Sequence, residues 1–191
     1  MNVLHVISGR GPTGPAAAAL EDAKALRAAG HAVFVAARDG SILMRVCREQ
    51  GLSTVGGLSL GRGAMRILKL PRDARRLRSI VRECGIDTVH VHRTDDQLLA
   101  AAALGRRLTT RLIRTWHRDP SATPRLLLAR IARYADGCIT VSHAAADALR
   151  KAGAPRAEYI PAGVDTDVFK PLACAPDSGR FQEPGARSAF P

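Results

Sequence analysis

The chain has 191 residues, of which 46% are hydrophobic and 4% aromatic, and its formal net charge at pH 7 is +12. This length is enough for one domain with a substantial core. No segment reaches the ~20 apolar residues that a membrane-spanning helix needs. The start, "MNVLHVISGRG", lacks the basic and apolar regions of a secretory signal. We therefore expect a cytoplasmic protein rather than an integral membrane protein.

The positive charge favours an anionic partner, such as nucleic acid, anionic lipid or a phosphorylated substrate. It is concentrated between Arg62 and Arg82, a segment that contains eight basic residues and one acid, Asp73. The four cysteines, Cys47, Cys84, Cys138 and Cys174, lie more than 30 residues from one another, and none forms a C-x-x-C pair. We expect reduced, mostly buried thiols and neither a zinc site nor a disulfide framework.

Apolar patterning predicts strands that alternate with helices. Pro15 is placed to begin the first helix and Gly30 to end it, and Pro71 and Gly85 bound a later helix in the same way. Strands are expected at residues 2–8, 31–37, 87–92, 111–117, 138–142 and 157–163, and helices at 15–30, 41–50, 71–85, 95–107, 124–137 and 144–153. The strands read as almost continuously apolar, as burial on both faces requires.

This order predicts an α/β fold in which a doubly wound parallel sheet carries helices on both faces. Residues 1–171 form the predicted domain. The last 20 residues, 172–191, have no periodicity and are rich in Pro, Gly and Ala. We expect them to be a disordered tail.

The first predicted strand runs into a glycine-rich loop in which Gly9, Gly11 and Gly14 have the spacing G-x-G-x-x-G. Such a loop binds a dinucleotide through backbone N–H groups that point at a pyrophosphate. Pro12 and Pro15 remove two of these donors. A nicotinamide-dependent oxidoreductase therefore stays one alternative, and a tight turn without a ligand is another.

Two histidines, His90 and His92, are two residues apart on a predicted strand, so their side chains point to the same face. The spacing suits metal ligands, but no third ligand is evident in the sequence, and two ligands leave the coordination of a metal incomplete. We expect no metal site there. Trp116 is interpreted as a core residue.

The segments "YADGCITVSHAAADALRKAGAP" and "AEYIPAGVDTDVFKP" resemble the region before the domain boundary in family 4 glycosyltransferases. The matching features are the strand end Val141-Ser142, the turn Ile160 to Asp165 and the Phe-x-Pro at Phe169 to Pro171. Further matches are "LRAAGHAV", "GIDTVHVH" and "RTWHRD". The resemblance covers residues 1 to about 171. It implies the GT-B architecture, with this chain as the amino-terminal, Rossmann-like, acceptor-binding domain.

The resemblance also implies an activity: retaining transfer of a sugar from a nucleotide-sugar donor to a glycan or lipid-linked acceptor, without a bound metal or other cofactor. From the same resemblance we expect a role in the synthesis of cell envelope glycans. The family's donor-binding second domain, with its Arg/Lys pair and Glu-x7-Glu segment, has no counterpart after Pro171. We therefore expect a truncated enzyme or a subunit that has no measurable turnover alone.

By the same resemblance, individual residues acquire expected roles. Gly11, Thr13 and Gly14 fall in the loop that approaches the donor diphosphate, with Thr13 in place of the first glycine of the family's Gly-Gly pair. His117 matches the histidine that faces the donor sugar and its phosphate, where an imidazole can donate a hydrogen bond. His92 is expected on the acceptor side, and Ser142 either binds acceptor or caps the next helix.

The basic segment has two interpretations. Family members that use lipid-linked acceptors rest their first domain on an anionic membrane, where each basic residue contributes ~1 kcal/mol. The other interpretation is a solvated, arginine-rich face. A nucleic-acid-binding module is a third alternative, but the aromatic residues that stack on single strands are missing between the arginines, and we expect no nucleic acid partner. The residues of the expected membrane patch are Arg62, Arg66, Lys69, Arg72, Arg75, Arg76 and Arg78.

Overall fold

A computed structural model of the chain describes residues 1–9, 11, 13–60, 64–105, 109–120, 123–154, 156–161, 163 and 166, without the side chains of residues 64–67. The predicted tail, 172–191, lies outside these residues, as do Arg62 and the Phe169 to Pro171 motif. The elements are β1 (Asn2–Ile7), α1 (Gly14–Ala28), β2 (Ala32–Ala37), α2 (Ile42–Glu49), β3 (Ser53–Val55), α3 (Ala64–Glu83), β4 (Thr88–Val91), α4 (Thr94–Leu104), β5 (Arg111–Trp116), α5 (Arg125–Ala132), β6 (Gly137–Thr140), α6 (His143–Lys151) and β7 (Ala157–Tyr159).

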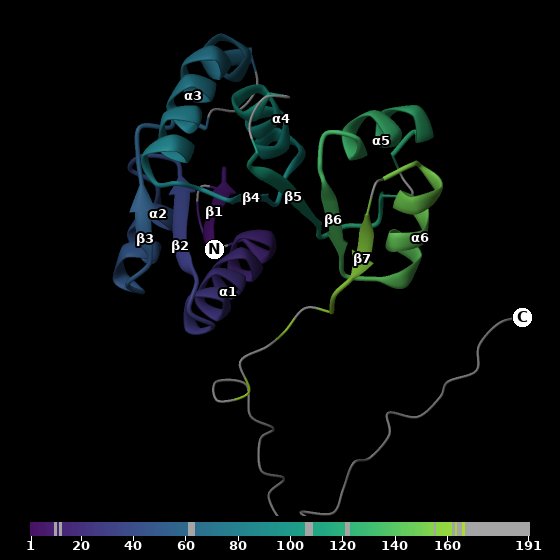
Figure 1. Cartoon of the computed structure of the whole chain (residues 1–191), viewed down its shortest axis with the longest axis horizontal. Coiled ribbons are helices and arrows are strands. Elements are labelled where there is room, and N and C mark those ends of the chain that lie inside the picture. Colours follow the sequence, from purple (N-terminus) through teal and green to yellow (C-terminus); the bar gives the residue numbers. More distant parts are fainter. Residues whose placement is uncertain are drawn as a thin grey trace, which may run out of the picture.

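The strands form one parallel sheet with the order β3-β2-β1-β4-β5-β6-β7. The chain therefore builds outward from β1 in one direction, crosses back beside β1 and builds outward in the other. Figure 1 shows α1 on one side of the sheet and α3 and α4 on the other. This arrangement confirms the predicted α/β class and the Rossmann-like, doubly wound sheet.

Alternation along β1 divides the core between the two sides of the sheet. Leu4 and Val6 pack in a cluster with residues of α3 and α4, such as Leu77 and Leu99. Ile7 packs in a second cluster with residues of α1 and α2. Because successive side chains of a strand point to opposite faces, His5 lies on the same side as Ile7, the side of α1.

Two predicted helices differ from the structure by five residues or more at one end, and one strand was not predicted. Helix α3 begins at Ala64, seven residues before Pro71, which lies inside the helix. The strong helix formers in "AMRILKL" outweigh the missing N–H of one proline. Helix α5 ends at Ala132, five residues before the predicted end, because Asp136 is held at the start of β5: Leu112 N donates to its carboxylate at 2.7 Å. The short edge strand β3 was not predicted.

One buried carboxylate ties α3 to the loop after β3. Asp73 is 4% exposed and accepts hydrogen bonds from Ser59 N at 3.2 Å, Ser59 Oγ at 2.7 Å and Leu60 N at 3.0 Å. Leu60 has a positive φ of 39°, a conformation that an L-residue holds only when its surroundings require it. Asp73 supplies that requirement and is therefore structural.

We expect Asp73→Ala to lower the free energy of unfolding by about 2–4 kcal/mol, because two backbone N–H groups and a hydroxyl lose a charged acceptor. Urea denaturation followed by circular dichroism measures the change. The matched control is Asp147→Ala, which removes an exposed carboxylate from α6 and should cost less than about 0.5 kcal/mol. Equal effects of the two substitutions would contradict the role of Asp73.

Candidate functional site: a histidine chain beside a cleft

Four histidines gather where β1, β4 and β5 end. His5 in β1 pairs in register with His90 in the neighbouring strand β4. His92 lies one residue after β4, and His117 lies one residue after β5. Strands β1 and β4 are the pair at which the strand order reverses, the place where open α/β sheets bind ligands at their carboxyl ends.

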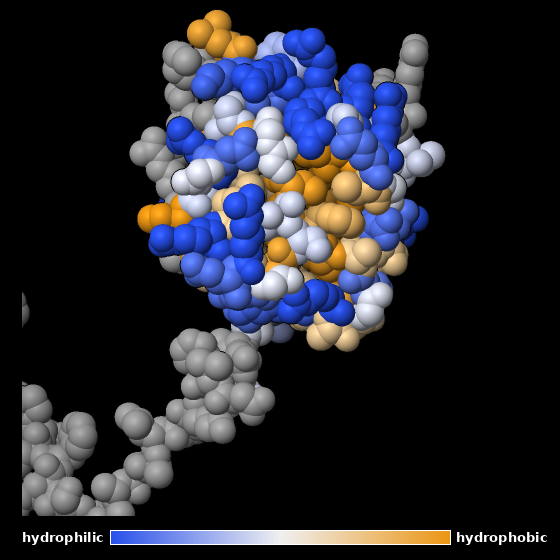
Figure 2. Space-filling model, turned by 90° about the vertical axis from the view of Figure 1, so that its left-hand side faces the viewer, coloured by the Kyte–Doolittle hydropathy of each residue, from blue (hydrophilic) through white to orange (hydrophobic). Residues whose placement is uncertain are grey.

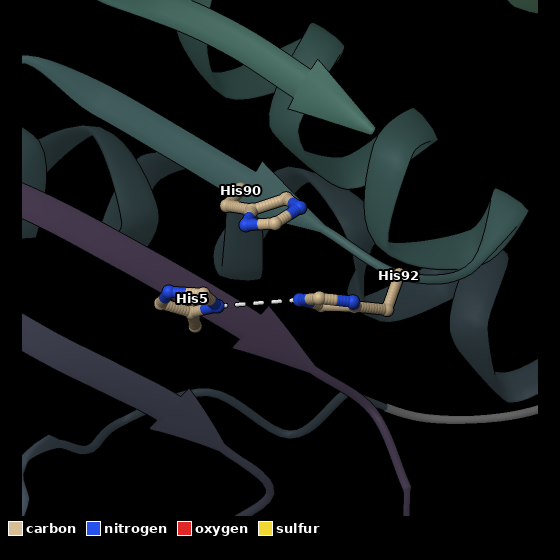
Figure 3. Close-up of side chains that lie close together, drawn as sticks. All are labelled: His5, His90 and His92. Atoms are coloured by element: carbon tan, nitrogen blue, oxygen red, sulfur yellow. Dashed lines mark hydrogen bonds between the residues drawn. The ribbon is translucent and has the colours of Figure 1, made fainter. Parts of the chain in front are cut away.

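The imidazole rings are connected by hydrogen bonds. A bond of 3.2 Å joins His5 Nδ1 to His92 Nε2, and a bond of 3.1 Å joins His92 Nδ1 to His117 Nε2. Figure 3 shows the first of these bonds and the ring of His90 beside it. His90 forms a separate bond of 2.7 Å between its Nε2 and Thr115 Oγ1 in β5. His5, His92 and His117 thus form a continuous chain of imidazoles, which we call the histidine chain.

Burial keeps these imidazoles neutral. His5, His90 and His92 are between 0% and 6% exposed. Desolvation by burial is the main cause that lowers the pKa of each, and neighbouring histidines lower it further. The pKa of His90 falls to about 4. The pKa of His117 is also lowered, first by burial and then by the Arg114 guanidinium.

Three of the histidines form a group that could hold a metal ion. His5, His90 and His92 each offer a ring nitrogen, and these nitrogens lie within 4.8 Å of one another. The structure thus supplies, in His5, the third residue that the sequence did not reveal. However, the His5 and His92 rings are inclined by only 13°, and their nitrogens point at each other. This geometry suits an N–H···N hydrogen bond, whereas a tetrahedral metal needs lone pairs that converge on a common point.

A cleft of about 560 Å³ borders the histidine chain. His92 and His117 line it, together with Pro15 from the first turn of α1. The first turn of α1, through Pro15, and His117 therefore face a shared opening. The other lining residues are Arg93, Thr94, Asp95, Arg114, Thr115, Trp116, Arg118, Asp119 and Thr123.

The residues expected to approach a donor diphosphate lie at the start of α1. Thr13 is the N-cap residue, and its N–H donates to Gly11 O at 2.8 Å. Gly14 is the first residue of the helix. In the described part of the chain, a Cβ built on Gly11 or Gly14 would contact no atom within 4 Å. Internal packing therefore does not explain these two glycines, and open space lies beside both.

Ser142 is not brought into this cleft. Its Oγ accepts a hydrogen bond from Ala145 N at 3.1 Å, which makes it the N-cap of α6. Of its two expected roles, the structure assigns the cap. Trp116 packs in the core cluster with α5 and α6, as interpreted from the sequence, and the Arg114 guanidinium lies 3.5 Å from its ring centroid.

The basic segment is divided by the structure. Arg78 Nε donates to Ala103 O at 2.7 Å, and Arg76 bonds Gly56 O and Glu83 at 3.2 Å each. These two side chains thus have internal partners. Arg72 and Arg75 are exposed and Lys69 is half-buried, whereas Arg62 and the side chain of Arg66 lie outside the described residues. In Figure 2, the upper part of the molecule, where Figure 1 places α3, is mostly hydrophilic.

Sequence reasoning missed several buried polar residues near the site. Arg114 is 4% exposed, and it donates to Gln97 Oε1 and, at 3.0 Å, to Thr94 Oγ1. Asp96 is 1% exposed and accepts from Ser8 N at 3.3 Å; burial is the main cause that raises its pKa to about 7. A charged residue inside an apolar strand or helix face was the signal that could have identified both.

The pKa shifts predict that the free energy of unfolding decreases as the pH is lowered below about 6.5. Between about pH 4.5 and 6.5 an unfolded histidine binds a proton that buried His5, His90 and His92 do not, so each histidine makes acid destabilising by up to about 1.4 kcal/mol per pH unit. Asp96, with its raised pKa, acts in the opposite direction, but three groups outweigh one. Urea denaturation at several pH values measures the slope.

Two substitutions separate this effect from general acid sensitivity. His90→Phe should reduce the slope of unfolding free energy against pH by about the contribution of one histidine, because phenylalanine binds no proton in either the folded or the unfolded state. His143→Gln, on the exposed start of α6, should leave the slope unchanged. A slope that His90→Phe does not alter would show that His90 is not excluded from protonation by the fold.

No helix in the described part of the chain is long and apolar enough to cross a membrane.

No curated protein sequence matches the chain significantly. Among solved structures, the chain is similar to HepE (Alr3699) from Anabaena, crystallised with UDP and glucose, with a TM-score of 0.67 and 19% identity over 87% of this chain and 46% of HepE. It is also similar to sucrose-phosphate synthase from Thermosynechococcus elongatus, with a TM-score of 0.67 and 16% identity over 90% of this chain and 50% of the synthase.

A third similar structure is MurG from Acinetobacter baumannii, with a TM-score of 0.56 and 17% identity over 73% of this chain and 41% of MurG. The chain thus spans about half the length of these structures, which share its GT-B type of Rossmann-like fold. The sequence model of Glycosyltransferase Family 4 matches residues 12–168. This match includes the start of α1, the histidines at 90, 92 and 117, and all strands after β1. The chain therefore belongs to Glycosyltransferase Family 4.

Proposed function

We propose that this chain is the acceptor-binding half of a retaining glycosyltransferase that transfers a sugar from a nucleotide-sugar to a glycan or lipid-linked acceptor. The observation that carries the proposal is the cleft shared by His117 and the start of α1. A donor diphosphate between them would meet the open space beside Gly14 and a half-buried imidazole. A nicotinamide-dependent oxidoreductase and a nucleic-acid-binding module find no comparable support in the family match.

The donor-binding half is proposed to come from outside these 191 residues. In support, the chain spans 46% of HepE and 50% of the sucrose-phosphate synthase. HepE was crystallised with UDP-glucose, so a nucleotide-sugar is the donor class that we propose. His117 would contact the sugar-phosphate centre, His92 would lie toward the acceptor, and the chain alone would have no measurable turnover.

We expect weak binding of UDP-glucose and of inorganic pyrophosphate, the group common to nucleoside-diphosphate donors, at the cleft of the isolated chain. Titration of the isotope-labelled chain, followed by amide chemical shifts, should show changes at the start of α1 and around His117. His117→Ala should weaken binding about tenfold, because a hydrogen bond to a charged group is lost. UDP release should stay undetectable.

The matched control is His143→Ala, which removes an exposed imidazole outside the cleft and should leave both titrations unchanged. Shift changes confined to a surface away from α1 and His117, or no changes with either ligand, would contradict the proposed site. Sugar release by the isolated chain would contradict the proposed dependence on a second half.

We also propose that the exposed basic residues of α3 bring the protein to the cytoplasmic face of an anionic membrane, where lipid-linked precursors of cell envelope glycans would be available. The support is the net charge of +12 and the exposure of Arg72 and Arg75. Each cation near such a surface contributes ~1 kcal/mol. Arg76 and Arg78, which have internal partners, would contribute less.

Membrane binding is tested by co-sedimentation with vesicles that contain phosphatidylglycerol. The double substitution Arg72→Glu with Arg75→Glu should reduce the partition coefficient by at least tenfold at low salt, since two attractive charges become repulsive. The control is Arg150→Glu, which also lowers the net charge but lies on α6 instead of α3. It should reduce binding far less. Equal binding to neutral phosphatidylcholine vesicles would contradict an electrostatic mechanism.

A further inference from the structure

The histidine chain leads from the core of the domain to the cleft. Its inner member, His5, is 0% exposed, its middle member, His92, is 5% exposed, and its outer member, His117, is half-buried and lines the cleft. Successive rings are nearly parallel, with interplanar angles of 13° and 27°. This arrangement allows each ring to bond the next through the ring nitrogens, in line with the plane of the imidazole.

The protons of the chain can be arranged in two ways. A neutral imidazole has one N–H and one lone pair, and burial keeps these rings neutral near pH 7. Because His92 uses both nitrogens, it must donate at one and accept at the other. Either Nδ1 carries the proton in His5 and His92, and His117 Nε2 accepts, or all three rings carry the proton on Nε2.

The inner end of the chain distinguishes these two arrangements. His5 Nε2 is fully buried and has no hydrogen-bond partner in the part of the chain that the structure describes. If Nε2 carried the proton, a polarised N–H would be buried without an acceptor, which is rare in folded proteins. If Nδ1 carries it, Nε2 is a lone pair against its neighbours, and the N–H of His5 is used in the bond to His92.

We propose that His5 and His92 are positioning residues that hold His117 in the tautomer with its proton on Nδ1, so that His117 is a hydrogen-bond donor toward an anionic oxygen in the cleft. In this tautomer Nε2 accepts from His92 Nδ1, and Nδ1 is the ring atom left for a ligand. His117 then has no free lone pair with which to act as a general base.

The charges around the cleft fit a ligand that accepts hydrogen bonds. Arg93, Arg114 and Arg118 line it, and Asp95 and Asp119 are the acids among the lining residues. The Arg114 guanidinium lowers the pKa of His117 further, which keeps the ring a neutral donor. Naming a diphosphate as the anion rests on the proposed function, whereas the tautomer of His117 follows from the histidine chain alone.

Nitrogen NMR of the histidine-labelled full chain tests the tautomer directly, because protonated and unprotonated ring nitrogens have well-separated shifts. At pH 7.5 we expect the Nδ1–H form of His117 to exceed the Nε2–H form by at least about tenfold, since the Nε2–H arrangement buries the N–H of His5 Nε2 without an acceptor. Exposed His143, in the same spectrum, should favour Nε2–H, the usual form in water. His117 in the Nε2–H form, or in a mixture like that of His143, would overturn the proposal.

Two variants locate the cause. His92→Phe removes the link, and His117 should then return to the ratio seen for His143. His90→Phe is the matched control, because His90 is equally buried beside the chain but bonds Thr115 instead; it should leave the His117 ratio unchanged. A preserved Nδ1–H form in His92→Phe would overturn the positioning role. If that variant does not fold, the wild-type spectrum still decides the tautomer.

Pyrophosphate is the probe for the donor role. On its addition, the Nδ1 proton of His117 should shift downfield while the ring remains neutral. Conversion of His117 to the Nε2–H form on binding would overturn the donor role. Because the wild-type tautomer is measured without ligand, a failure of the chain to bind UDP-glucose would count against the proposed function and not against the histidine chain.

Discussion

The parallel pairing of β1 with β4 positions the rest of the site. It places His5 opposite His90 and Val6 opposite Val91, at the point where the sheet changes its direction of growth. From this point α1 leaves β1 on one side of the sheet and α4 leaves β4 on the other. The two chain segments therefore diverge after the strands end, and the space between them is open to a ligand. The cleft, the first loop and the histidine chain all lie around this divergence.

The same pairing explains why imidazoles can be buried here. The apolar clusters above and below the sheet exclude water, and the exclusion lowers the pKa of His5 and His92 well below the usual value. A neutral imidazole is compatible with such burial when its ring nitrogens form hydrogen bonds with those of neighbouring imidazoles. The fold thereby obtains polar side chains inside the sheet without an unpaired charge, and it extends them from the core to the cleft.

A second hydrogen-bond network supports the cleft from the face of the sheet opposite the histidine chain. Arg114 of β5 connects to Thr94 and Gln97 of α4 and lies over Trp116. Its charge is buried, and burial lowers its pKa to about 10. The arginine connects the end of β5, from which His117 projects, to the first turn of α4. These hydrogen bonds hold the end of β5 beside the first turn of α4.

The alternation of apolar strands and helices determined the α/β class, because periodicity is a local property that burial on one or two faces imposes on any sequence. The resemblance of the segments from Tyr134 to Pro171, with the further matches around His92 and His117, likewise indicated the family, and Pro15, Gly30 and Gly85 located helix ends through backbone geometry. Local patterns could not reveal that Asp73 holds the loop at Leu60 or that β3 forms the sheet edge. Each depends on contacts with distant residues.

For the site, the sequence alone identified His90 and His92 as a same-face pair and placed His117 at the end of a predicted strand. Only the tertiary structure brought His5, 85 residues before His90, into contact with them. It also assigned Ser142 to a helix cap and gave Arg76 and Arg78 internal partners. The physical reason is that strand order and register, which no single segment encodes, decide which side chains meet at the carboxyl edge of a parallel sheet.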